Sequence, residues 1–250
     1  MRALVENGHQ VHLVVATKGE AGLADLSGSE LGKIRIQELQ EVSELIGVDN
    51  LFWLGYADSG LEGNKRGSRE TFVAADLELA AERLADFCRS VTADVLVGYD
   101  KQGGYGHPDH LKVHQVASRA AEILDIDIFL EATVSQNAIR RIVTPLSPLA
   151  YILRQPEALK IREAFSPDSE IGITVDISKF TKVKRLSLEK HASQHSGGEQ
   201  LRTLKAFSAL PQFVFDLLFR KEWFVVRWEK SNSNPLRNLG KSKELSSQKR

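Results

Sequence analysis

The chain has 250 residues, with 33 Lys plus Arg and 33 Asp plus Glu, so its formal net charge at pH 7 is zero. This balance argues against a broad nucleic-acid or acidic-membrane surface, because such surfaces need an excess of Lys and Arg. The single cysteine, Cys88, excludes an internal disulfide and a thiolate metal cluster, and no apolar run reaches the roughly 18 residues that a membrane span needs. The N-terminal residues lack the apolar stretch of a signal peptide, and we expect a cytoplasmic protein.

Strands and helices are expected to alternate along the first half of the chain. Residues 2–8 read as the last turns of a helix that ends at Gly8, and residues 11–16 form a β-branched apolar run typical of a buried strand. The further predicted elements are a helix at 29–46, a strand at 51–54, a helix at 71–90, a strand at 94–99, a helix at 109–124 and a strand at 128–130. This order predicts an α/β fold with a doubly wound, mostly parallel (Rossmann-like) sheet, whose ligand site lies at the carboxyl ends of the strands.

The second half of the chain has a less regular pattern, because prolines interrupt the region from 145 to 167. A strand at 173–177, a helix at 178–191 and a closing strand at 223–228 are expected. Residues 231–250 are polar and have no apolar period, which predicts a disordered tail behind a single domain over residues 1–230.

One segment, directly after the strand at 94–99, contains several residues of the types that act in catalysis or bind metals. It contains a glycine-rich stretch and then His107, Pro108, Asp109 and His110, with His114 one helical turn further on. Pro108 suits the first position of a helix, which makes His107 a candidate N-cap, and the helix dipole there favours a neutral imidazole. A neutral imidazole is what a divalent metal needs as a ligand, and His110 and His114 are spaced to share one face of the helix. The alternative is a polar helix start with solvent-facing histidines.

The stretch at 103–110, Gly-Gly-Tyr-Gly-His-Pro-Asp-His, resembles the second signature of the LmbE-like (PIG-L) N-deacetylases, which remove an acyl group from an amino sugar or related amide with the help of a metal. Weaker matches to the family follow in the family's order along the chain, at 17–22, at Arg35 and Glu38, at 54–60 and at 191–194. Within them, the form Asp-Ser-Gly at 58–60 is similar to that of the mycothiol-pathway members. The resemblance covers about residues 1 to 195 and implies a small-molecule N-acyl amino sugar or conjugate as substrate.

The resemblance implies a role for each matching residue of the signature. His110 is the expected ligand of Zn²⁺ or another divalent metal, and His107 is expected to stabilise the tetrahedral intermediate or to protonate the leaving amine. Asp109 is expected to hold a histidine in place. Tyr105 resembles a mobile tyrosine that helps to polarise the substrate carbonyl.

Two further residues are expected to face the sugar hydroxyls, Arg35 and Asp58. Without the resemblance, Arg35 reads as a solvated charge on an amphipathic helix, and the segment 58–60 reads as a simple turn. His191 and His195 flank a helix end, where histidines often cap carbonyl groups.

The family's first signature, Ala-His-Pro-Asp-Asp-Glu, has no counterpart in this sequence. It supplies two further metal ligands and the general base, so we expect that roughly thirty residues, one strand and half a helix, are absent before Met1. The leading hypothesis is a zinc-type N-deacetylase that is weak or inactive in this form, because a catalytic zinc site takes three protein ligands. The alternative is a catalytically dead sugar- or thiol-conjugate-binding relative. A nucleotide-binding protein is disfavoured because the glycine spacing does not form a dinucleotide fingerprint.

Overall fold

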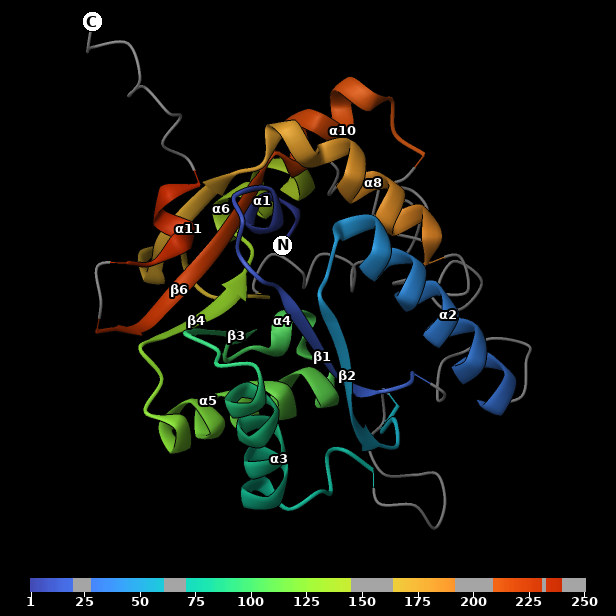
Figure 1. Cartoon of the computed structure of the whole chain (residues 1–250). Coiled ribbons are helices and arrows are strands. Elements are labelled where there is room, and N and C mark those ends of the chain that lie inside the picture. The colour runs from blue at the N-terminus through green and yellow to red at the C-terminus, as the bar shows by residue number, and fades with distance from the viewer. Residues whose placement is uncertain (20–27, 61–70, 145–163, 192–208, 231–232, 240–250) are drawn as a thin grey trace, which may run out of the picture.

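The computed structural model of the chain describes residues 1–19, 28–60, 71–144, 164–191, 209–230 and 233–239, and Figure 1 shows their arrangement. Helices and strands alternate through the first half, as expected for an α/β fold. In chain order they are α1 (Arg2–Glu6), β1 (His12–Thr17), α2 (Gly28–Ile46), β2 (Asn50–Tyr56), α3 (Leu77–Ser90), β3 (Val95–Tyr99), α4 (Gly103–Gly106), α5 (Pro108–Leu124), β4 (Ile128–Thr133), α6 (Gln136–Val143), the short 3₁₀ helix η3 (Asp168–Glu170), β5 (Ile171–Asp176), the 3₁₀ helix η4 (Ser178–Phe180), α8 (Thr181–Lys190), α10 (Gln212–Phe219), β6 (Lys221–Glu229) and α11 (Pro235–Asn238).

The strands of the described residues form two sheets. β1 and β2 pair in parallel, and a second sheet has the order β3-β4-β6-β5. Within the second sheet β3 and β4 are parallel, whereas β6 runs antiparallel to both β4 and β5. The α/β class is therefore confirmed, while the expected single sheet is divided between β1 and β3. The antiparallel strands come from the less regular C-terminal part, where β6 returns between β4 and β5.

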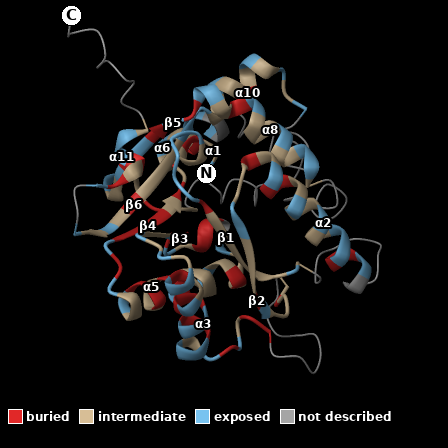
Figure 2. Ribbon diagram, viewed as in Figure 1, coloured by how far each residue is buried: buried red, intermediate tan, exposed pale blue. Residues whose placement is uncertain are grey.

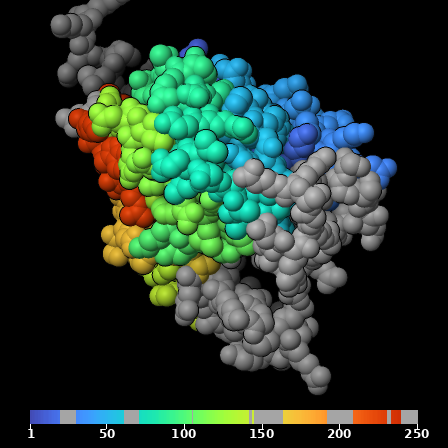
Figure 3. All heavy atoms as spheres, turned by 90° about the horizontal axis from the view of Figure 1, so that it is seen from below, coloured from blue at the N-terminus to red at the C-terminus, as the bar shows by residue number. Residues whose placement is uncertain are grey.

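One core joins the two sheets, because helices α3 and α5 pack beneath both of them (Figures 1 and 2). Small side chains let these helices approach closely. They are Ala80, Ala81 and Ala85 on α3, and Ala117, Ala120 and Ala121 on α5. Val14 of β1, Phe52 of β2, Leu96 of β3 and Phe129 of β4 all contact this core. Seen from below, α3 to α5 form a continuous face between the N-terminal part and the second sheet (Figure 3).

A second, smaller core lies on the other face of β4, where Ile128 and Leu130 pack against β5, α1 and α11. Helix α11 corrects the expectation of a disordered tail for residues 233–239, while the rest of the segment 231–250 lies outside the described residues. Asn234 is fully buried and accepts a hydrogen bond from the Leu236 backbone N–H at 3.0 Å, and Pro235 occupies the first helical position. Leu236 is buried in the second core, so two apolar side chains, Leu236 and Leu239, are sufficient to anchor this otherwise polar segment.

Several element boundaries differ from the sequence expectation for local reasons. α3 begins at Leu77 and not at residue 71, because Asp76 is the N-cap and accepts from the Leu79 backbone N–H at 3.0 Å. Thr71 instead bridges Ala57 at the end of β2. Among the described residues, no helix has both the length and the apolar character needed to cross a bilayer.

Cys88 is buried on α3, as the sequence predicts for a small apolar side chain. Burial raises the pKa of its thiol to about 11. The thiol is therefore protonated at neutral pH, which argues against a nucleophilic role.

Candidate functional site

The glycine-rich segment after β3 folds tightly against the start of α5. Gly103, Gly104 and Gly106 all have positive φ angles, of 61°, 65° and 87°. A Cβ atom on Gly103 would lie 2.7 Å from the backbone nitrogen of Leu111, so only glycine fits this close approach. Tyr105 belongs to α4, and its side chain lies outside the described part of the structure.

His107 is the N-cap of α5, as predicted. Its Nδ1 accepts a hydrogen bond from the Asp109 backbone N–H at 3.1 Å, and Pro108 follows at the first helical position. Because Nδ1 is the acceptor, a neutral His107 carries its proton on Nε2. This places a hydrogen-bond donor at the edge of the ring that faces away from the helix backbone.

His110 lies one turn into α5 and has the opposite tautomer. Its Nδ1 lies 3.3 Å from the carbonyl oxygen of Gly103, which can only accept, so Nδ1 carries the proton and Nε2 carries the lone pair. Burial and the neighbouring His107 lower the pKa of His110 to about 4. Its ring centroid lies 5.1 Å from that of His107. An imidazole with a donor at Nε2 and an imidazole with an acceptor at Nε2 are therefore neighbours.

Asp109 is buried in the first turn of α5 and connects it to the loop after β2. Its Oδ2 accepts a hydrogen bond from the Ser59 backbone N–H at 3.2 Å, while its Oδ1 is buried and has no hydrogen-bond partner. Burial raises the pKa of this carboxyl, against the opposing effect of the Ser59 contact. In the described contacts the Asp109 carboxylate holds this loop, and its predicted role towards a histidine stays a prediction.

Asp58 lies at the head of a turn, next to the Ser59 residue that contacts Asp109. Its Oδ1 accepts from the Gly60 backbone N–H at 2.8 Å, which confirms the turn expected at 58–60. Burial lowers the pKa of His110 and raises that of Asp109, and Asp58 opposes the first effect and adds to the second. The structure therefore brings Asp58 together with the predicted catalytic residues.

Arg35 is half-buried on α2 and donates a hydrogen bond to the Gly19 carbonyl oxygen in the loop after β1. Its Nε is buried without a hydrogen-bond partner. The simple solvated charge is therefore the wrong interpretation, and the contact that is described holds a loop. The matched segments at 20–22 and 192–194, together with His195, lie outside the described residues, while His191 ends α8 as the cap position allows.

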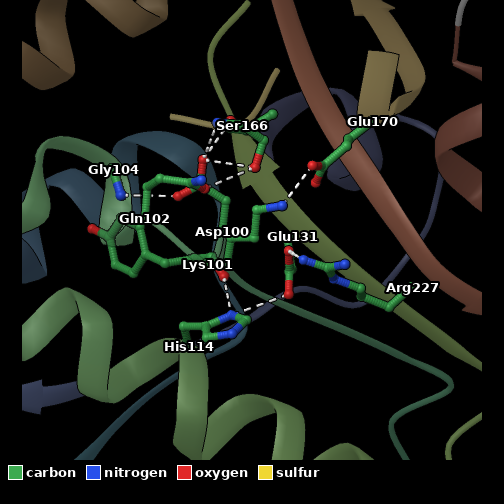
Figure 4. Close-up of polar contacts among 11 residues, drawn as sticks. Asp100, Lys101, Gln102, Gly104, His114, Glu131, Ser166, Glu170 and Arg227 are labelled. Atoms are coloured by element: carbon green, nitrogen blue, oxygen red, sulfur yellow. Dashed lines mark hydrogen bonds and ion pairs between the residues drawn. The ribbon is translucent and has the colours of Figure 1, made fainter. Parts of the chain in front are cut away.

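His114 makes its described contacts with groups other than His110, and the pairing of the two as metal ligands stays a prediction. Its Nδ1 lies 3.3 Å from the Tyr99 carbonyl oxygen and 3.1 Å from Oε1 of Glu131 (Figure 4). Glu131 is fully buried on β4, and its Oε2 forms an ion pair with Nη2 of Arg227 at 2.7 Å. Glu131 was not predicted as a functional residue from the sequence, although a charged residue within the apolar strand 128–133 indicates a buried charge that needs a partner.

Asp100, directly after β3, anchors the polar network next to these ion pairs (Figure 4). Its carboxylate is fully buried and accepts from the Gly104 backbone N–H at 3.0 Å, the Thr133 hydroxyl at 2.5 Å and the Ser166 backbone N–H at 2.9 Å. The network connects the glycine turn to β4 and to the segment that precedes η3. Lys101 on the same loop pairs with Glu170 at 2.5 Å.

The described residues do not by themselves form a catalytic metal site. Within the described ranges no group of three or more His, Cys, Asp or Glu side chains could hold a metal ion. His110 Nε2 and the unpartnered Asp109 Oδ1 are two suitable donor atoms, whereas a catalytic zinc takes three protein ligands and a water. His110, the histidine predicted as a metal ligand, can therefore contribute one ligand, but the described residues do not supply the three that a catalytic zinc needs.

Comparison with known proteins places the chain among deacetylases. The family model described as "PIG-L: GlcNAc-PI de-N-acetylase" matches residues 1–121. A 1D-myo-inositol 2-acetamido-2-deoxy-alpha-D-glucopyranoside deacetylase of Streptomyces avermitilis is 34% identical over 223 residues, covering 78% of this chain and 76% of the relative. The Salinispora arenicola protein of the same name is 32% identical over 219 residues, covering 80% and 71%.

A solved structure supports the same fold. N,N'-diacetylchitobiose deacetylase from Pyrococcus horikoshii, complexed with its inhibitor MPG, superimposes with a TM-score of 0.56 over 90% of this chain and 75% of that one, at 19% identity. At this identity the likeness concerns the fold alone. The two curated relatives, at more than 30% identity over more than two thirds of their length, decide the assignment: the chain belongs to the PIG-L (LmbE-like) family.

Proposed function

We propose that this protein is a hydrolase that removes the acetyl group from an N-acetylated amino sugar conjugate. The observation that carries the proposal is the pair of imidazoles at the start of α5, one with a donor at Nε2 and one with a lone pair at Nε2, 5.1 Å apart. The relatives support the substrate class, since their names specify a 2-acetamido-2-deoxyglucose joined to inositol. The predicted cytoplasmic location stays a prediction.

The reaction is the hydrolysis of an amide. Water adds to the acetyl carbonyl, the carbonyl oxygen becomes an oxyanion, and collapse of the tetrahedral intermediate breaks the C–N bond to give acetate and a free amine. We assign the Nε2–H of His107 to a hydrogen bond with the oxyanion or with the departing amine nitrogen, and the proton that the attacking water loses ends on that nitrogen. Asp58 and Arg35 are assigned to the sugar hydroxyls, and Tyr105 to the carbonyl.

Dependence on Zn²⁺ or another divalent metal is part of the proposal, with His110 as one ligand. Because the described residues supply two donor atoms and not three ligands, the roles above are assigned to protein side chains alone. We expect weak zinc binding and slow turnover for the 250-residue chain.

The same shortage of ligands favours a second candidate function, a protein that binds the sugar conjugate without hydrolysing it. The buried network around Asp100 and the Asp109–Ser59 contact are made by protein groups alone. A relative that lost turnover would retain these contacts.

The test combines turnover and binding. The chain is incubated with 1D-myo-inositol 2-acetamido-2-deoxy-α-D-glucopyranoside, with and without added zinc, and the free amine is measured by mass spectrometry. Binding of the same compound is measured by calorimetry. Amine release that falls about a hundred-fold or more in His107→Ala supports the deacetylase. Binding without release supports the second candidate, and the absence of both results overturns both.

His110→Ala is the companion variant, and Lys112→Ala serves as its control. Lys112 lies on the same helix and donates to the Ala75 carbonyl oxygen at 2.7 Å, away from the two histidines. We expect zinc-stimulated release to disappear in His110→Ala and to persist in the control. Vigorous deacetylation with one bound zinc per chain would contradict the expected slow turnover.

A further inference from the structure

Tyr99, the last residue of β3, stacks on the imidazole of His110. The two rings are almost parallel, at 7°, with their centroids 4.3 Å apart. We infer that Tyr99, held by the buried Glu131–His114 pair, is a positioning residue that fixes the direction of the His110 Nε2 lone pair. The inference rests on the proposed function, in which His110 serves the reaction.

Two contacts restrict the His110 ring in different ways. Stacking on Tyr99 fixes the plane of the imidazole, because rotation about the second side-chain torsion would break the parallel contact. The Gly103 carbonyl oxygen, 3.3 Å from Nδ1, selects which edge of the ring faces the glycine turn. Together they leave a single direction for Nε2 and a single neutral tautomer.

Tyr99 is itself held by groups that the proposed reaction does not use. Its carbonyl oxygen lies 3.3 Å from Nδ1 of His114, and the same nitrogen lies 3.1 Å from Glu131 Oε1. Glu131 lies beside Tyr99 in the sheet, since Gly98 pairs with Glu131 and Tyr99 with Ala132 in the parallel register. The fully buried carboxylate is balanced on its other side by Arg227. A line of contacts therefore runs from Arg227 on β6 through Glu131 on β4 and His114 on α5 to Tyr99 and the His110 ring. Figure 4 shows its first part, from Arg227 to His114.

The exposure of the Tyr99 side chain favours a positioning role over a role in core packing. Its side chain is among the exposed large apolar groups, at 39%, so it adds less to the core than a buried aromatic residue. An aromatic ring at this place instead supplies a flat surface for the imidazole. A ring of similar shape without the hydroxyl group should serve equally well.

The experiment compares Tyr99→Phe, which keeps the flat ring, with Tyr99→Leu, which removes it. The ¹⁵N resonances of the histidine rings are recorded at a fixed neutral pH in zinc-free protein, and His110 is identified by its absence in His110→Gln. We expect wild type and Tyr99→Phe to show one His110 tautomer with the proton on Nδ1. Tyr99→Leu should show averaged shifts from two tautomers, because a ring that is free to rotate no longer keeps Nδ1 at the Gly103 carbonyl oxygen.

Turnover provides a second measure. In Tyr99→Leu we expect kcat to fall about ten-fold with KM nearly unchanged, and Tyr99→Phe to restore it, because misplacement of a reacting group affects the transition state more than binding. If the wild type proves inactive, the proposed function fails, while the NMR comparison still decides the positioning role. Retention of the single tautomer in Tyr99→Leu overturns the inference.

Loss of folding in Tyr99→Leu is checked by circular dichroism. Should that variant not fold, Tyr99→Met, whose unbranched flexible side chain adapts to the available space without a flat ring, is examined by the same NMR measurement. A single His110 tautomer in a folded Tyr99→Met would equally overturn the inference, whereas averaged shifts would support it.

Discussion

The half-buried His114 and the fully buried Glu131 form a pair that connects the stability of the chain to pH. The ion pair with Glu131 raises the pKa of His114 above its ordinary value of 6.5. Burial acts to raise the pKa of Glu131, but the contacts with His114 and Arg227 outweigh it and lower that pKa below 4.5. The two pKa shifts have opposite signs, so the pair contributes most to stability within a limited range of pH.

The first prediction follows from these signs. The contribution of His114 is complete below pH 6.5 and is lost as the pH rises through the raised pKa, while that of Glu131 is present above pH 4.5 and is lost as the pH falls through the lowered pKa. Replacing His114 with Gln should therefore destabilise the chain most between these limits. Urea unfolding at pH 6 and at pH 8.5 measures the difference between wild type and variant, which should be smaller at pH 8.5. An equal difference at both values would contradict the assignment.

At the scale of elements, α5 is positioned by its direct contact with β3. A Cβ atom on Gly98 would lie 2.8 Å from the Cβ atom of Ala117, a distance that real side chains do not tolerate. The helix that starts with His107 and His110 therefore depends on a glycine in the middle of the neighbouring strand.

The second prediction uses this contact. Gly98→Ala should force α5 away from the sheet and lower the free energy of unfolding by about 1–3 kcal/mol, as overpacking does. The double variant Gly98→Ala with Ala117→Gly restores the space and should recover most of the loss, apart from the lower helix propensity of glycine. Denaturant unfolding of the four proteins of this cycle gives the coupling, and additive effects would contradict the proposed clash.

The third prediction concerns α11. Asn234→Ala removes the cap that accepts from the Leu236 backbone N–H, and it should lower the free energy of unfolding by about 1 kcal/mol or more, since Asn234 is fully buried. Asn238→Ala, at an exposed position of the same helix, is the matched control and should change stability little. Equal stability of both variants would show that the cap is not needed.

Periodicity and capping residues predicted most of the helices and strands, because these signals are local. The N-cap at His107 and the end of α2 before Gly47 are examples, and Gly47 has the positive φ of 84° that a helix stop favours. The helix expected from residue 71 failed because the Thr71–Ala57 bridge is a contact with a distant strand. Helix α11 was missed because two leucines in a polar segment become informative only when a core exists to receive them.

The candidate site was predictable as a cluster but not as a network. Spacing placed His107, Asp109 and His110 in one turn, and the structure confirms their proximity. Asp109 contacts Ser59 in the loop after β2, and His114 contacts Glu131 on β4. Both pairings depend on how the sheets and helices are assembled. No short-range pattern encodes such contacts.

At the scale of the whole molecule, the two sheets share a core but no hydrogen-bonded pair of strands among the described residues. Helices α3 and α5 carry the connection, because α3 contacts β2, α5 contacts β3 and β4, and the two helices pack against each other. The candidate site spans this division, since Ser59 follows β2 while the histidines follow β3. Its geometry therefore depends on helix packing as much as on strand pairing.

The division of the sheet has a consequence for behaviour in concentrated samples. Within the described residues β1 pairs only with β2, and β3 only with β4, so each offers one row of backbone N–H and C=O groups to another chain. Neither strand contains an acidic residue, Lys or Arg, which are the usual guards against intermolecular strand addition, and Val97 of β3 is 42% exposed. Light scattering should therefore reveal self-association that grows with protein concentration, and a lysine introduced at Val97 should suppress it.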